Sequence, residues 1–82
     1  MDLGGASRHY EEALALAQAL GMRPLVARCR LGMGRLARRA GEFGIARRHL
    51  DAAAALLHEL GMTYWLERVD LDRIGPTAGA AP

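Results

Sequence analysis

The residues from Asp2 to Met22 recur, without gaps, as the residues from Glu42 to Met62, so the chain repeats itself with a period of 40 residues. An internal repeat of this length is typical of architectures in which each unit buries its apolar face only against its neighbour. Proteins of this kind usually bind other proteins. The positions that are identical in the two copies are Gly4, Ala6, Arg8, His9, Ala13, Ala15, Leu16, Leu20, Gly21 and Met22 and their counterparts Gly44, Ala46, Arg48, His49, Ala53, Ala55, Leu56, Leu60, Gly61 and Met62.

Apolar residues at steps of three and four predict four helices. The first ends at Gly21, and the second covers about 24–40, with Pro24 in its first turn, where the missing N–H is no loss. The third covers about 42–60 and ends at Gly61. Thr63 is the predicted N-cap of a short fourth helix that ends at Gly75-Pro76. We therefore expect one helical segment over 1–75 and a disordered tail over 76–82.

The connections between the predicted helices are only two to four residues long, so consecutive helices must lie antiparallel. This predicts an all-α fold, in which helical hairpins form a right-handed stack rather than a closed bundle.

The run from Met33 to Ala53, with Gly34, Ala37, Gly41-Glu42-Phe43, Ala46 and Leu50 at its fixed positions, resembles the tetratricopeptide repeat (TPR). In that family, small residues lie where paired helices approach each other, and Gly34, Ala46 and Ala53 match those positions. Ala37 and Arg30 stand where the family often has aromatic residues, and the period exceeds the usual ~34 residues. The resemblance implies a short TPR-like superhelix that serves protein–protein interaction.

Three further runs, 20–29, 38–41 and 60–67, resemble the last repeats of large bacterial signalling proteins. Those proteins join a nucleotide cyclase or a transcription-regulator head to an ATPase module and a repeat array. The resemblance implies that this chain is the terminal part of such an array, without cyclase or ATPase motifs of its own.

The basic residues, all of them arginine, are concentrated in the middle of the chain. Residues 1–22 carry one arginine and three acidic residues, a formal charge of −2. Residues 23–48 carry eight arginines and one acidic residue, a charge of +7. Residues 49–82 carry two arginines and five acidic residues, a charge of −3. Helical spacing places Arg28, Arg35 and Arg39 on one face of the second helix, with Arg38 beside them.

In the TPR family the first helix of each pair lines a concave groove. The family's peptide-contacting positions correspond here to Arg28, Leu31, Arg35, Arg38 and Arg39, and one repeat later to Arg68 and Leu71. Because guanidinium groups bind carboxylates in bidentate fashion, we expect this groove to bind an acidic peptide. The alternative is an arginine face that serves only solubility.

Other functional classes find less support in the sequence. Nucleic-acid binding is disfavoured because the ends are acidic and the aromatic residues are not interleaved with the arginines. Cys29 lies in the apolar stripe without a histidine at a helical step, and His9, His49 and His58 match no zinc spacing, so we expect no enzyme activity, metal or cofactor. The single cysteine and the absence of a signal peptide or membrane span predict a cytoplasmic protein.

The ends of the repeat array are incomplete in this sequence. One full hairpin is flanked by two halves, and the first helix lacks a preceding partner, so its side chains Leu3, Tyr10, Leu14 and Leu20 are expected to face water. We expect such a face to associate with a second copy and therefore predict a homodimer. A structural capping repeat without its own ligand is the second hypothesis.

Overall fold

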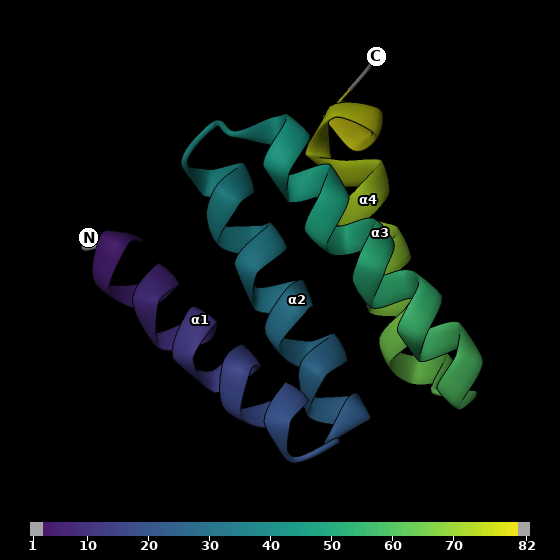
Figure 1. Cartoon of the computed structure of the whole chain (residues 1–82). Coiled ribbons are helices and arrows are strands. Elements are labelled where there is room, and N and C mark those ends of the chain that lie inside the picture. The colour runs from purple at the N-terminus through teal and green to yellow at the C-terminus, as the bar shows by residue number, and fades with distance from the viewer. Residues whose placement is uncertain (1–2, 81–82) are drawn as a thin grey trace.

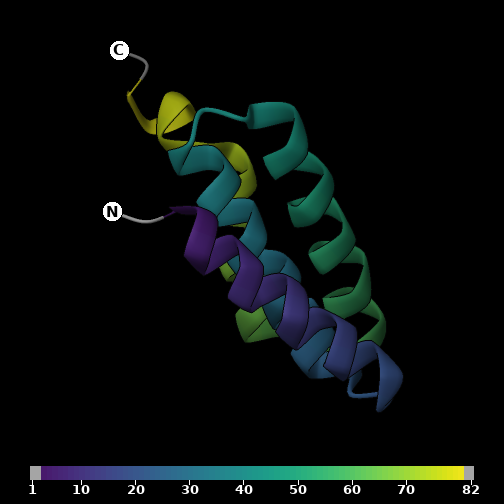
Figure 2. The same cartoon turned by 60° about the vertical axis from the view of Figure 1, so that its left-hand side comes forward.

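A computed structural model describes the backbone of residues 3–80 and the side chains of residues 5–73. Its four helices are α1 (Leu3–Ala19), α2 (Arg23–Arg39), α3 (Phe43–Leu60) and α4 (Thr63–Ala80). No strand occurs within residues 3–80, so the predicted all-α fold of about four helices is confirmed. Each helix packs mainly against the helices that precede and follow it, which gives an open stack with α1 and α4 at its ends (Figures 1 and 2). The stack is flat, measuring 45 × 32 × 17 Å.

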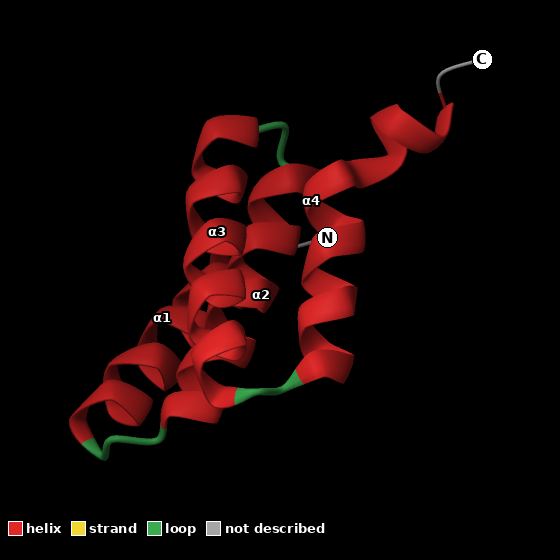
Figure 3. Cartoon of the chain, turned by 90° about the vertical axis from the view of Figure 1, so that its right-hand side faces the viewer, coloured by secondary structure: helices red, strands yellow, loops and turns green. Residues whose placement is uncertain are grey.

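The three turns between the helices are copies of one motif, spaced 20 residues apart (Figure 3). Gly21, Gly41 and Gly61 have φ angles of +68°, +80° and +69°, the left-handed conformation that glycine adopts without strain. In each turn, two backbone N–H groups donate back to the last turn of the helix, as in the bonds from Gly61 to His58 (3.1 Å) and from Met62 to Leu57 (3.0 Å). These are Schellman caps, and they stop each helix at its glycine.

Each following helix begins in the same way. The carbonyl groups of Met22, Glu42 and Met62 accept the first helical bond, from Val26, Ala46 and Leu66. Met62 is therefore the N-cap residue of α4, and the prediction of Thr63 was wrong by one position. The 40-residue sequence repeat is thus present in the backbone as two successive helix–turn units.

The core lies between α2, α3 and α4 and is built from small and aliphatic side chains. Ala46, Leu50, Ala53 and Leu57 of α3 are all buried, as the helical spacing predicts, whereas Phe43 at the start of the same stripe is 67 % exposed. The buried cluster consists of Ala27, Leu31, Leu50, Ala53, Ala54, Leu57 and Val69.

Two glycines inside α2 allow its neighbours to approach closely. A Cβ atom on Gly34 would lie 2.7 Å from the Leu50 side chain of α3, and one on Gly32 would lie 2.3 Å from the Tyr10 ring of α1. Since residues two apart point to nearly opposite sides of a helix, each glycine serves a different neighbour. The small residue expected at Gly34 therefore does lie at a helix–helix contact.

Two expectations for the ends of the chain differ from the structure. Leu14 was expected to face water but is only 8 % exposed, whereas Leu20 is 63 % exposed, as expected; the side chain of Leu3 lies outside the described residues. The fourth helix continues past Gly75 and Pro76 to Ala80, bending before its last turn (Figure 3), so the predicted helix end was wrong. Residues 81 and 82 of the expected tail lie outside the described residues.

A specific contact accompanies the continuation of α4. Pro76 has no N–H, so the carbonyl oxygen of Asp72, four residues earlier, lacks its helical donor. The Arg38 guanidinium of α2 donates to that oxygen at 2.5 Å. Arg73 of the same helix forms ion pairs with Asp51 of α3 at 3.1 Å and with Asp70 at 3.2 Å. Polar contacts from Arg38 and Asp51 thus connect this part of α4 to α2 and α3.

Candidate functional site

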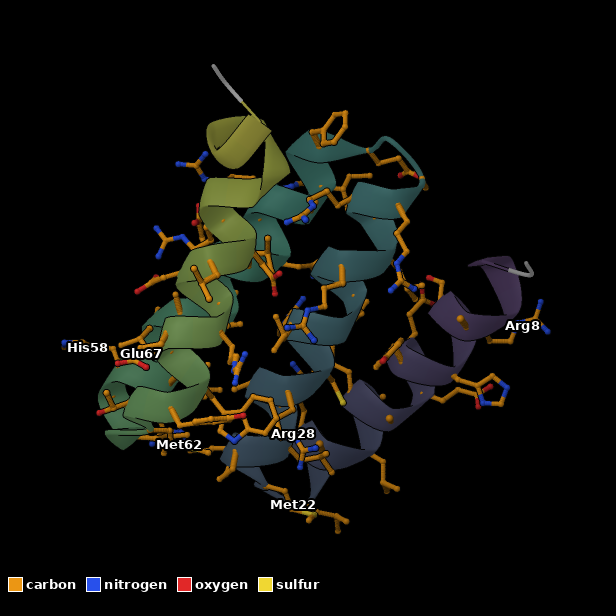
Figure 4. The ribbon with its side chains drawn as sticks, turned by 180° about the vertical axis from the view of Figure 1, so that it is seen from behind. Arg8, Met22, Arg28, His58, Met62 and Glu67 are labelled. Atoms are coloured by element: carbon orange, nitrogen blue, oxygen red, sulfur yellow. The ribbon has the colours of Figure 1, made fainter. Side chains whose placement is uncertain are left out.

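The basic face of α2 borders a groove between α1, α2 and α4. This α2–α4 groove has a volume of about 310 Å³. Figure 4 shows Arg28 on the side of the molecule where α4 lies in front. Three of the predicted binding residues, Arg28, Leu31 and Arg35, line the groove, together with apolar and aromatic side chains that the sequence did not assign to it, among them Tyr10, Leu25 and Trp65.

Two arginines and two aromatic residues form a continuous array along this side. The Arg28 guanidinium lies 4.8 Å from the centroid of the Trp65 ring, and Trp65 meets Tyr64 edge-on at 5.4 Å. Arg68, the repeat counterpart of Arg28, lies 4.9 Å from the Tyr64 ring and donates to its hydroxyl group at 3.0 Å. A guanidinium group that stacks on an aromatic ring contacts it with its flat face, so the N–H groups at its edge can still donate hydrogen bonds to a ligand.

Arg35 and Arg38 are engaged by α4. Arg35 Nε donates to a carboxylate oxygen of Asp72 at 2.7 Å, and Arg38 binds the Asp72 carbonyl oxygen and lies 3.9 Å from its carboxylate. The Asp72 carboxylate therefore lies close to two of the seven residues predicted to line the groove. The positive charge left for a ligand is carried mainly by Arg28, Arg39 and Arg68, none of which forms an ion pair with a described carboxylate.

The remaining predicted residues, Leu31, Leu71 and Arg39, differ in how exposed they are to solvent. Leu31 is only 3 % exposed and contributes the floor of the groove, while its counterpart Leu71 is 64 % exposed. Arg39 is exposed on the same face of α2 as Arg28, about 16 Å further along the helix axis. The predicted residues thus form a line along α2 and α4 rather than a single pocket.

A second basic cluster lies on another face of α2 and was not predicted. Arg30, Ile45, Arg48 and His49 line a cavity of about 310 Å³, and Arg30 Nη1 lies 3.3 Å from His49 Nδ1. Burial lowers the pKa of His49 below its ordinary value of 6.5, and the charges of Arg30 and Arg48 lower it further, while Glu11 opposes them. The pair Arg48-His49 copies Arg8-His9, which was visible in the sequence, but the approach of Arg30 from α2 was not.

Among the described residues, none of the helices combines the length and apolar character needed to cross a membrane, and His, Cys, Asp and Glu side chains form no group suited to a metal ion. Cys29 is a buried free thiol. No protein-family model, curated protein or solved structure matches this chain.

Proposed function

We propose that this chain is a protein–protein interaction module that binds an acidic peptide segment in the α2–α4 groove. The observation that carries the proposal is the stack of Arg28 on Trp65 inside a groove that also presents Tyr10 and Leu25. Such a surface offers guanidinium N–H donors to carboxylates and apolar area to the side chains between them. Arg68 and Arg39 extend the same basic line at its two ends.

The TPR resemblance supports the same proposal, because it assigns this face to the concave, peptide-binding side of a repeat array. On the separate resemblance of residues 20–29, 38–41 and 60–67 to the last repeats of bacterial signalling proteins, we further propose that the chain is the terminal segment of such a protein, in the cytoplasm. The contacts of Asp72 refine the proposal: Arg35 and Arg38 hold α4 in place, and Arg28 and Arg68 make the ligand contacts.

The test uses Trp65, the single tryptophan of the chain, as a reporter inside the groove. A dye-labelled peptide of alternating glutamate and leucine is titrated, with its anisotropy giving the affinity and Trp65 emission giving the location. We expect saturable binding that Arg28→Glu weakens at least about tenfold, since a charged hydrogen-bonding partner is worth roughly 1.5–3 kcal/mol.

The matched control is Arg8→Glu, which makes the same change in net charge on α1, away from the groove (Figure 4). It should bind the peptide as the unaltered protein does. The proposal fails if the two variants lose affinity equally, because the peptide affinity would then depend on the net charge of the protein and not on contacts in the groove. Circular dichroism of both variants shows that the helices are retained.

A structural cap or self-association segment is the second candidate function. It is favoured by Leu16 and Leu20, which are 61 % and 63 % exposed on the same side of α1. In this proposal α1 pairs with a second copy, and sedimentation equilibrium at micromolar concentration should show a homodimer. A stable monomer under those conditions contradicts it.

A further inference from the structure

The second basic cluster is separate from the α2–α4 groove. Arg30 follows Arg28 by two residues, so its side chain leaves α2 about 160° away from that of Arg28. It approaches α3, where Arg48 and His49 lie next to each other, and Ile45 completes the lining of the cavity. A ligand held here would contact none of the residues assigned to peptide binding.

No carboxylate of the described residues forms an ion pair with the arginines of this cluster, although Glu11 and Glu42 line a neighbouring cavity that shares Ile45 and His49 with it. Neither Arg30 nor Arg48 forms an ion pair with a carboxylate of residues 5–73. The preceding arginine, Arg47, does pair with Asp51, at 3.5 Å. Glu11 of α1 acts on His49 through its charge, but its side chain is exposed and bonded only to Ser7, at 3.5 Å. Two guanidinium groups thus line one cavity, and neither of them is paired with a carboxylate of the described residues, so both can bind an anion.

The hydrogen bond between Arg30 and His49 fixes the protonation of the imidazole ring. A guanidinium group can only donate, so His49 Nδ1 must accept, and the neutral ring carries its proton on Nε2. His49 therefore keeps one N–H donor that Arg30 does not use. Together with Arg48, the cluster supplies donors of the kind that bind tetrahedral oxyanions.

We propose that Arg30, Arg48 and His49 form a binding site for a phosphoryl group, either inorganic phosphate or a phosphate monoester. Within the described residues, all three groups are present together only in the second repeat copy. Arg8 and His9 correspond to Arg48 and His49, but within the described residues no helix precedes α1 to supply a counterpart of Arg30.

This difference provides an internal control, because the three histidines of the chain can be followed in one NMR spectrum. Inorganic phosphate and a capped phosphoserine peptide are titrated separately, at constant pH and at an ionic strength held with sodium chloride. We expect the ring protons of His49 to shift saturably with at least one of the two probes, while those of His9 and His58 do not. The probe with the lower Kd identifies the source of the phosphoryl group.

Two variants test the residues. Arg48 is exposed, so Arg48→Ala should fold normally and weaken phosphoryl binding about tenfold, the effect of one charge-assisted contact. Arg47→Ala removes the same charge one position earlier and should bind as the unaltered protein does. The inference is overturned if all three histidines shift alike, if neither probe gives saturation, or if Arg47→Ala loses as much affinity as Arg48→Ala.

Discussion

Helices α1 and α3 are repeat copies of each other, yet they differ in how much of their surface is covered. Both end on a left-handed glycine with the same two backbone bonds, and Ala17 and Leu57 occupy the same buried position in each. On the outer side, however, Leu56 and Leu60 are half-buried in α3, whereas their counterparts Leu16 and Leu20 are exposed in α1. The repeated sequence determines the local backbone, and the neighbouring helix determines burial.

The difference extends to polar residues. His9 is exposed on α1, while His49 lies against Arg30 of α2 and has a lowered pKa. The same dipeptide is therefore a solvated surface feature in one copy and part of a basic cavity in the other. The surroundings of this dipeptide therefore depend on a neighbouring helix and not on its own helix alone.

The largest effect on stability should come from shortening a side chain that α3 buries against its neighbours. Leu57 is 1 % exposed, so Leu57→Ala removes a fully buried side chain and should lower the free energy of unfolding by about 3 kcal/mol. Leu16→Ala, on the uncovered face of α1, should change it by less than about 0.5 kcal/mol. Urea unfolding followed by circular dichroism at several protein concentrations measures both. A cost for Leu16→Ala that grows with protein concentration would show that a second copy covers α1.

A smaller contrast is expected from the two glycines of α2. In Gly34→Ala the new methyl group meets Leu50, which is 2 % exposed, and lies 3.4 Å from the backbone oxygen of Ala46, so α2 and α3 must separate. We expect a loss of about 1–2 kcal/mol, since overpacking exceeds the gain of about 1 kcal/mol in helix propensity. In Gly32→Ala the obstacle is the Tyr10 ring, which is 36 % exposed and can rotate outward, so the net change should stay within about 0.5 kcal/mol.

Gly44→Ala is the control for both substitutions, because a Cβ atom there meets no atom within 4 Å. It should leave stability unchanged or raise it slightly through helix propensity. Thermal unfolding of the three variants ranks them directly. Equal losses for Gly32→Ala and Gly34→Ala would mean that α1 is held against α2 as firmly as α3 is.

The local structure of this chain was predictable because it depends on residues close in sequence. Steps of three and four residues placed the helices, and the glycines at 21, 41 and 61 placed the turns to within a residue or two. The end of α4 was missed because it involves Arg38, which lies 34 positions before the Asp72 carbonyl group that it binds. A pattern within one helix contains no information about such a contact.

The candidate site was predictable only in part, for the same reason. Helical spacing correctly grouped Arg28 and Arg35 on one face of α2, and both line the groove. It did not reveal that Arg35 and Arg38 both donate hydrogen bonds to Asp72, or that Leu31 is buried while Leu71 is exposed. These outcomes depend on contacts between residues of α2 and α4 that lie far apart in the sequence, which short-range periodicity does not determine.

The smallest expected effect is a difference in pH dependence between the two repeat histidines. The pKa of His49 lies below its ordinary value of 6.5 because of burial and the charges of Arg30 and Arg48, with Glu11 acting in the opposite direction. In the unfolded chain this histidine takes up its proton first as the pH falls below about 6.5, so the unfolded state gains protons and stability declines. His49→Gln should remove that part of the decline in melting temperature on acidification, and His9→Gln should not.

If phosphate occupies the cavity, it favours protonated His49, so adding phosphate should reduce the decline in the unaltered protein and have no such effect on His49→Gln. Identical melting curves for the two glutamine variants at every pH would show that the surroundings of His9 and His49 are electrostatically equivalent, and the distinction between the covered and uncovered copies would then not extend to their charges.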